Sequence, residues 1–190
     1  VALAVRTKGT GAIDLAAGSS GVNISNGGTV TAITRTAQGS LYTSVPSLAI
    51  SAPTTTGGVQ AVASANLGVT AVAIAGGGTG YTAGDTLTIS GGTGTAAQLT
   101  VGTVSSGVIT SISVAAQNGV YSVFPTSPVS VTGGTGSGAT FNISGGILSV
   151  FTITNAGSGY VEQPTVSFSG GGGSGASAYA TVGSATTIRG

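Results

Sequence analysis

Cysteine, histidine, methionine and tryptophan are absent from this sequence of 190 residues. Without Cys and His, the chain has no disulfide framework, no thiolate nucleophile and none of the soft ligands that zinc prefers. Charge is scarce as well, because Lys and Arg together number four and Asp and Glu together number three. We therefore expect no metal site, no cofactor and no catalytic activity.

The scarcity of charge excludes several further classes. An ordinary soluble domain carries about 25% charged residues, whereas this chain carries 4%. Nucleic acid and anionic membranes attract clusters of Lys and Arg, so neither is an expected partner. Disordered chains combine low hydrophobicity with high net charge, but here the mean hydropathy is +0.50 and the net charge is +1. No run approaches the roughly 20 apolar residues of a membrane-spanning helix.

Glycine and hydroxyl side chains dominate instead, with 36 Gly, 25 Ser and 30 Thr residues. The strongest pattern is an internal repeat, marked by tyrosines that follow one another at 39, 40 and 39 residues: Tyr42, Tyr81, Tyr121 and Tyr160. A Thr or Ser stands eleven residues before each of these tyrosines. The pattern predicts an N-terminal β segment over 1–29 and four copies of about 39 residues, over 30–68, 69–107, 108–146 and 147–190, the last with a C-terminal tail.

Each copy has the pattern of three short strands. The first strand leads through a Gly-bearing turn to the Tyr, as at 69–75 and 147–154, with β-branched residues at a period of two. The second strand follows at 47–51, 86–90, 128–132 and 165–169, and the third at 59–65, 96–101, 139–144 and 176–182. The sequence therefore predicts an all-β fold of four three-stranded repeats, with about twelve strands of four to seven residues, either fibre-like or resembling a β-solenoid or β-prism.

The first strand of the second copy indicates how the repeats associate. One face carries Thr70, Val72 and Ile74, while the other carries Val69 and two alanines. A solvated sheet face is usually polar, so this small, uncharged face is expected to meet another sheet or another chain. Because large side chains are few, one copy alone buries little apolar surface, and burial between copies must supply the remaining stability. We expect a homo-oligomer, with a trimer as the favoured state.

Few residues are candidates for a site. The only carboxylates are Asp14, Asp85 and Glu162, and the last two are interpreted as turn residues. As a pair, Asp85 and Glu162 would serve a polysaccharide depolymerase only if the fold brought them together.

The repeated tyrosines have two possible roles, of which the first is favoured. In the first role, the ring covers the glycine turn and the hydroxyl meets water or a backbone carbonyl. In the second role, the rings stack on sugars of a host glycan. The residues concerned are Tyr42, Tyr81, Tyr121 and Tyr160.

The segments GGGTGYTAGDTLTISGGTGTAAQLTV and NAGSGYVEQPTVSFSGGGGSGASAYATV resemble glycine-tyrosine repeats of structural proteins of tailed bacteriophages, especially fibre-like virion proteins of marine and cyanobacterial phages. The segment RTKGTGAIDLAAGSSGVNIS is similar to stretches of phage tail fibres. The first copy departs from this pattern, with Arg35 at an apolar position. The resemblance implies a virion fibre, tail appendage or surface decoration that contacts other virion proteins and contributes to host attachment. Similar repeats in bacterial surface proteins leave an extracellular adhesin or matrix protein that binds carbohydrate as the alternative.

Overall fold

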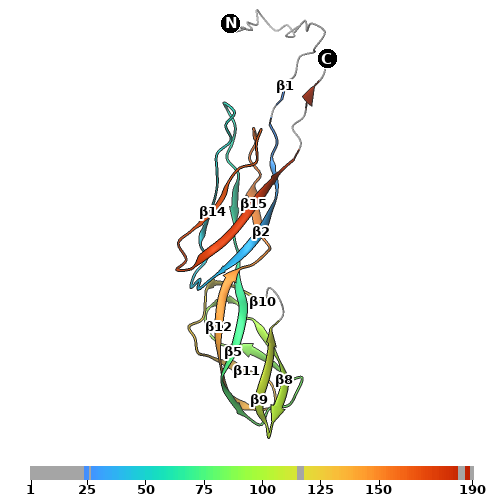
Figure 1. Ribbon diagram of the computed structural model, residues 1–190, viewed down its shortest axis with the longest axis vertical. Coiled ribbons are helices and arrows are strands. Elements are labelled where there is room, and N and C mark those ends of the chain that lie inside the picture. The colour runs from blue at the N-terminus through green and yellow to red at the C-terminus, as the bar shows by residue number, and fades with distance from the viewer. Residues whose placement is uncertain (1–23, 26, 115–117, 184–186, 189–190) are drawn as a thin grey trace, which may run out of the picture.

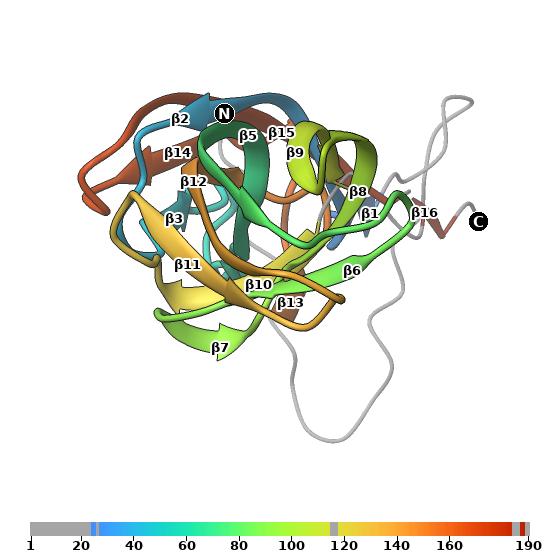
Figure 2. The same ribbon diagram turned by 90° about the horizontal axis from the view of Figure 1, so that it is seen from below.

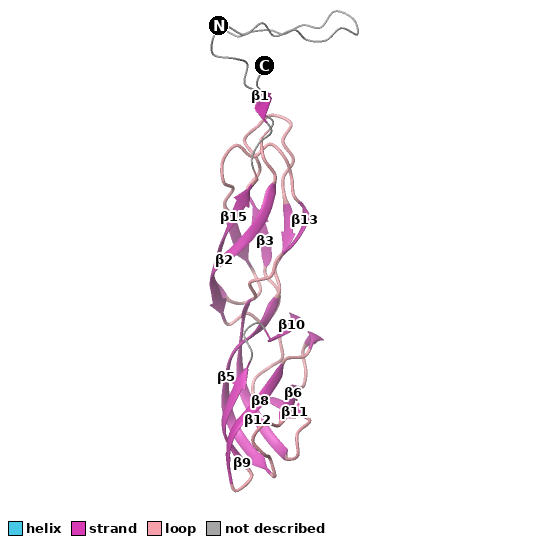
Figure 3. Cartoon of the chain, turned by 90° about the vertical axis from the view of Figure 1, so that its right-hand side faces the viewer, coloured by secondary structure: helices cyan, strands magenta, loops and turns pink. Residues whose placement is uncertain are grey.

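The described part of the chain is built from antiparallel β-strands. A computed structural model describes residues 24–25, 27–114, 118–183 and 187–188. Every helix or strand assigned within those residues is a strand, as Figure 3 shows, which confirms the predicted all-β class. Among the same residues, there is no helix of the length and apolarity that a membrane span requires.

Two lobes follow one another along the long axis of the molecule (Figure 1). The lower lobe in Figure 1 is called the middle lobe here because it comes from the middle of the sequence. It contains β5 (Leu67–Thr79), β6 (Thr86–Ile89), β7 (Thr93–Thr95), β8 (Gln98–Ser105), β9 (Val108–Val114), β10 (Asn118–Val123), β11 (Val129–Thr132) and β12 (Ser137–Ile147). The end lobe combines β2 (Val30–Ser40), β3 (Ser47–Ile50), β4 (Val62–Ser64), β13 (Thr152–Asn155), β14 (Val166–Ser169) and β15 (Ser174–Val182). Beyond the end lobe, β1 (Ile24–Ser25) pairs with β16 (Thr187–Ile188).

The middle lobe is one curled sheet with the strand order β7-β10-β5-β12-β11-β6-β8-β9. Seen from below in Figure 2, its strands surround a common centre. The curl brings β9 back to β5, where the backbone N–H of Tyr81 donates to Gly107 O at 3.0 Å. The long β5 and β12 pair along almost their whole length, from Thr79 opposite Ser137 to Leu67 opposite Ile147.

The end lobe has a corresponding order of strands. Its ladders join β2 with β15, β14 with β3, and β13 with β4. A single bridge between Thr165 and Tyr179 connects β14 with β15, and β3 lies next to β4. The order is therefore β2-β15-β14-β3-β4-β13, which matches β5-β12-β11-β6-β8-β9 of the middle lobe. Each lobe thus combines two repeat copies, and ladders between the copies, such as β5 with β12 and β6 with β11, alternate with contacts inside one copy, such as β11 with β12.

Aliphatic and aromatic side chains fill the inside of both lobes. In the middle lobe, residues without exposed surface form the centre of the core: Leu67, Leu87, Leu99, Phe141 and Ile147. The end lobe has a smaller cluster around Val30, Ile50, Tyr160 and Ala180. Tyr42 belongs to the end lobe but packs into the core of the middle lobe, so the two cores meet at the junction.

Polar contacts also hold the two lobes together. The guanidinium of Arg35 on β2 donates to the backbone oxygen of Ile147 on β12. Close by, the backbone N–H of Phe124 donates to Thr43 O at 2.8 Å, and that of Val45 to Ser122 O at 3.3 Å. Arg35 is half-buried, as is typical of a long cationic side chain whose apolar stem packs while the charged head reaches a polar group, here the Ile147 carbonyl.

Two details differ from the sequence prediction. The strands predicted at four to seven residues extend to eleven in β2 and β12 and thirteen in β5, because the glycines before Tyr81 pair with β12 instead of ending the strand. The face predicted to meet another sheet is not covered by this chain, since Ala71 and Ala73 are exposed. Val69, predicted to share that face, is fully buried, because the register shifts between Ser144 and Gly145 and reverses the alternation there.

Candidate functional site

The four repeated tyrosines lie inside the protein. The relative exposure is 3% for Tyr42, Tyr81 and Tyr160 and 1% for Tyr121. A sugar ring stacks only on an aromatic face that solvent can reach, and the burial of these four rings leaves almost none of that face accessible in this structure. The alternative role, packing of the ring against the glycine turn, corresponds to what is observed.

A glycine in the left-handed region lies beneath each of these rings. The four residues share a positive φ, of 64° at Gly39, 61° at Gly78, 74° at Gly119 and 65° at Gly157. A Cβ at Gly78 would lie 2.7 Å from Tyr81 Cε2 and 2.5 Å from the backbone oxygen of Ser137 on the facing strand. The other three glycines have equivalent neighbours. The ring, the glycine and the facing backbone therefore form one packing unit that occurs four times.

The hydroxyls of two tyrosines satisfy buried backbone groups. The Tyr121 hydroxyl accepts a hydrogen bond from Ala97 N at 2.7 Å, and the Tyr160 hydroxyl accepts one from Ala61 N at 2.8 Å. Tyr160 also donates to Ser51 O at 3.1 Å. Ala97 and Ala61 each come just before a strand, β8 and β4, so the tyrosines complete ladders that would otherwise leave a buried N–H unpaired.

Asp85 binds together two turns of the middle lobe. Its Oδ2 accepts hydrogen bonds from the backbone N–H groups of Thr82 and Thr135, both at 3.0 Å, and from the Thr135 hydroxyl at 2.8 Å. Its Oδ1 accepts from the Thr82 hydroxyl at 3.1 Å. These bonds favour the ionised form, and they lower the pKa of Asp85 from 3.8 to about 2, with the backbone N–H of Thr135 as the largest cause and that of Thr82 next. The Asp is a turn residue, as predicted, and it fixes a second turn fifty positions away.

Acid is therefore expected to weaken the fold through Asp85. Because the pKa is lowered in the folded state, the unfolded chain takes up the proton first, and stability is lost as the pH falls from about 4 toward 2. Asp85→Asn removes this contribution and lowers the urea midpoint at neutral pH. Urea unfolding between pH 2 and 7 measures both effects. Glu162→Gln, the same charge change in the other lobe, is the control, and equal acid sensitivity of Asp85→Asn and the native chain would contradict the assignment.

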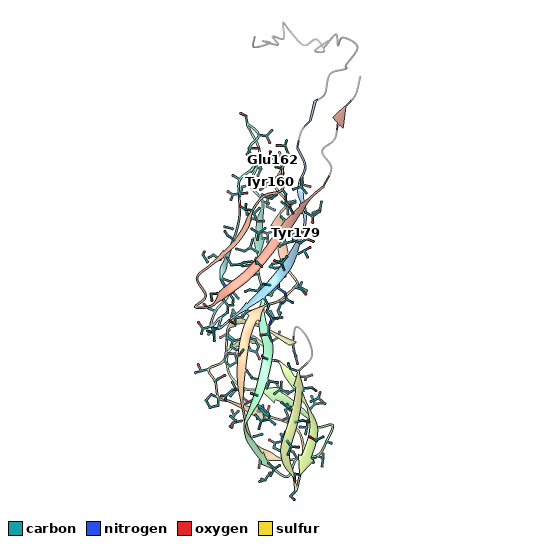
Figure 4. The ribbon with its side chains drawn as sticks, in the orientation of Figure 1. Tyr160, Glu162 and Tyr179 are labelled. Atoms are coloured by element: carbon teal, nitrogen blue, oxygen red, sulfur yellow. The ribbon has the colours of Figure 1, made fainter. Side chains whose placement is uncertain are left out.

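The carboxylates do not form a catalytic pair. Asp85 lies between β5 and β6 in the middle lobe, whereas Glu162 lies in the end lobe, near the tip shown in Figure 4. Asp14, the remaining carboxylate of the sequence, falls outside the described residues. Within the part of the chain that is described, no three His, Cys, Asp or Glu side chains gather in a way that could hold a metal ion. The two described carboxylates, Asp85 and Glu162, therefore do not form a pair placed for glycoside cleavage.

Two of the hollows on the described surface are relevant here. One, of about 200 Å³, lies in the end lobe between 51–54 and 160–165 and includes Glu162. The larger, of about 500 Å³, lies where the lobes meet and is lined by residues 41–44, 123–127 and 143–145. We call the second hollow the waist groove. None of its lining residues is charged, and its apolar walls come from both lobes.

Leu41 at the rim of the waist groove was not singled out by the sequence analysis. Its side chain is 71% exposed, and its φ of +64° lies in the left-handed region, where residues with a Cβ are strained. The corresponding residues before Tyr81 and Tyr160 are Gly80 and Gly159, with φ of +76° and +82°. The sequence does contain a signal for this residue, because Leu stands before Tyr42 where Gly stands before the other two tyrosines. Val123, 51% exposed, lies across the same groove.

No protein-family model matches this chain, and neither a curated protein nor a solved structure matches it.

Proposed function

We propose that this chain is a structural element of a tailed-phage virion: a fibre, a tail appendage or a surface decoration. The observation that carries the proposal is its shape, a narrow two-lobed rod in which β1 and β16 pair at one end and only turns lie at the other (Figure 1). A body of this kind projects from an attachment point. The resemblance of the glycine-tyrosine segments to phage fibre proteins supports a phage particle as the structure to which this rod belongs.

The role that we propose is mechanical. The paired β5 and β12 follow the axis of the middle lobe, and the paired β2 and β15 follow that of the end lobe (Figure 1). Bending such a rod requires many ladder hydrogen bonds to distort together. The described surface carries only Arg35, Asp85 and Glu162 as charged side chains, so the rod offers few sites to basic or acidic proteins of the host.

The four sequence copies are assigned to two interlocked pairs. In the middle lobe, the first strand of copy 69–107 pairs with the third strand of copy 108–146, the second strands pair with each other, and the third pairs with the first. Copies 30–68 and 147–190 pair in the same way in the end lobe. Each copy supplies half of a lobe and buries apolar side chains with its partner, while Tyr42 of copy 30–68 also packs into the core of the middle lobe.

We propose that copies of the whole chain associate further, as a homotrimer. The face of small side chains predicted to meet another chain is exposed on β5 and β9, with Ala71, Ala73 and Ala75 on the first and Ser111 and Ser113 on the second. Short side chains allow two backbones to approach closely, and the absence of charge on this face means that little desolvation opposes the contact. Sedimentation at micromolar concentration measures the state, and a mass of one chain would contradict it.

The alternative functions have less support. A carbohydrate-binding adhesin would need an exposed aromatic platform, and the four repeated tyrosines are buried. Of the described tyrosines, Tyr179 on β15 has the accessible ring, at 45% exposure (Figure 4). A depolymerase would need paired carboxylates, and Asp85 and Glu162 lie in different lobes. The scaffold function therefore remains the one that we propose.

Immunogold electron microscopy tests the location of the protein. An antibody raised against the purified chain is applied to purified phage particles and, separately, to uninfected host cells. The proposal expects gold on a tail or surface structure of the particles and none on the cells. Gold on the uninfected cell envelope, with unlabelled particles, would overturn the virion assignment in favour of a bacterial surface protein. An antibody absorbed with the purified chain provides the control for background.

A further inference from the structure

The waist groove is a preformed apolar hollow. Its walls include Tyr42 from the end lobe and Phe124, Pro125 and Ile143 from the middle lobe. The hydrogen bonds from Phe124 N to Thr43 O and from Val45 N to Ser122 O join the two lobes next to it. A groove fixed in this way requires no ordering when an apolar side chain enters, which lowers the cost of binding.

Leu41 stands at the rim of the same groove in a conformation that a glycine would adopt without strain. The strained φ and the exposed side chain are two unfavourable features of one residue. Its side chain contributes little to the stability of the chain alone, because most of it is in solvent. A contact outside this chain would bury the exposed side chain and so offset the backbone strain.

We propose that the waist groove binds Leu41 of a second copy of this chain. The protruding residue and the groove lie side by side on one surface, so two copies related by a two-fold axis can each insert Leu41 into the groove of the other, as a self-complementary interface requires. The lining is uncharged, and the described charges, Arg35, Asp85 and Glu162, lie outside it. A second copy therefore brings an equally uncharged surface, and no charge of either copy loses water in the groove.

This interface is independent of the virion assignment and separate from the small-residue face proposed for the trimer. Because the contact is two-fold, it doubles whatever assembly exists without it, giving two chains alone or six with the trimer. The three proposals therefore fail in different ways. If the groove contact is wrong, the number of chains is odd, and if the trimer is wrong, that number is not a multiple of three. If the virion assignment is wrong, the antibody labels a place other than the phage particle.

Sedimentation equilibrium of the full chain between 1 and 100 µM, with three variants, tests the proposal. We expect the native protein to contain an even number of chains. Leu41→Gly should halve that mass and weaken the two-fold association at least about a hundredfold, because two leucine side chains lose their burial. At a concentration low enough to dissociate both proteins, its melting temperature should equal that of the native chain or exceed it by about 2–4 °C, since the left-handed strain is relieved. Loss of association therefore cannot be attributed to misfolding.

Two further variants sharpen the test. Val123→Thr changes the opposite wall of the groove while keeping a β-branched residue in β10, and should also weaken the association. Val150→Thr is the matched control, because Val150 is 61% exposed but lies outside the groove, and it should keep the native mass. A native mass of one or three chains, or an unchanged mass for Leu41→Gly, would overturn the proposal. A native mass of one chain would leave an apolar segment of another protein as the ligand of the groove.

Discussion

Gly78→Ala is expected to lower the free energy of unfolding by about 2–5 kcal/mol. Gly78 has a φ of +61°, a conformation that costs a residue with a Cβ about 1–2 kcal/mol. Its new methyl group would also lie 2.5 Å from Ser137 O and 2.7 Å from Ala139 N, which are backbone atoms of β12, and 2.7 Å from the Tyr81 ring. Since β12 is paired along its length, it cannot move aside locally, and the overpacking adds about 1–3 kcal/mol.

Gly138→Ala is the matched control for this prediction. Gly138 lies in β12, has a φ of +78° and has no atom within 4 Å of the position of a Cβ. Its substitution introduces backbone strain without a clash, so we expect a loss of about 1–2 kcal/mol. Urea unfolding of both variants, followed by circular dichroism, gives the difference. Equal losses would show that the ring and the facing strand do not confine Gly78.

The recurrence of glycine and tyrosine in the sequence indicated the packing unit correctly. A Tyr that returns at intervals of 39 and 40 residues with a nearby Gly is the pattern of a structural element, and all four rings cover a left-handed glycine. The all-β class followed from alternating β-branched residues and from the many glycines that disfavour helix. These features are local, so they can be read from neighbouring residues in the sequence.

The partners of the strands could not be read in the same way. Every copy has similar strands at similar spacing, so a copy could pair with its neighbour or with a distant one, and the sequence pattern is equally satisfied. In the structure, copy 30–68 pairs with copy 147–190, although the residues of the middle lobe separate the two copies in the sequence. The lengths of the strands were underestimated for a related reason, since glycines that appear as turn residues in isolation become strand residues when β12 pairs with them.

The candidate site residues show the same division. The sequence placed Asp85 in a turn, but its bonds to Thr135 depend on a contact between distant segments. The sequence also left the tyrosines open as possible glycan contacts. Whether a ring is exposed depends on which distant strands cover it, and the sequence does not show those strands. The waist groove forms between lobes and has no sequence pattern. Only the leucine before Tyr42, at a position where glycine precedes Tyr81 and Tyr160, gave a local signal.

The second large effect is expected when a buried tyrosine hydroxyl is removed. Tyr121→Phe keeps the ring but leaves the buried backbone N–H of Ala97 without its 2.7 Å partner. A buried donor without an acceptor costs about 1–3 kcal/mol, and we expect the free energy of unfolding to fall by that amount. Tyr160→Phe should cost at least as much, because its hydroxyl accepts from Ala61 N and also donates to Ser51 O.

Two comparisons separate the hydroxyl from general effects of the substitution. Tyr179→Phe makes the same change on an exposed ring and should alter stability by less than about 0.5 kcal/mol. The Tyr121 and Tyr160 variants lie in different lobes, so the losses of the double variant should add if both lobes unfold together. A loss from Tyr121→Phe no larger than that from Tyr179→Phe would show that another group satisfies Ala97 N.

The dependence on alkaline pH gives an independent reading of the same hydroxyl. Burial raises the pKa of Tyr121, and the hydrogen bond from Ala97 N opposes this rise. Because the folded state holds the proton more tightly, this contribution to stability is complete below about pH 10, the ordinary pKa of tyrosine, and is lost as the pH rises from there through the folded-state pKa. Tyr121→Phe has no proton to lose and should lack that part of the alkaline decline. A decline as steep as in the native protein would place its cause elsewhere and leave the burial of Tyr121 without a role in it.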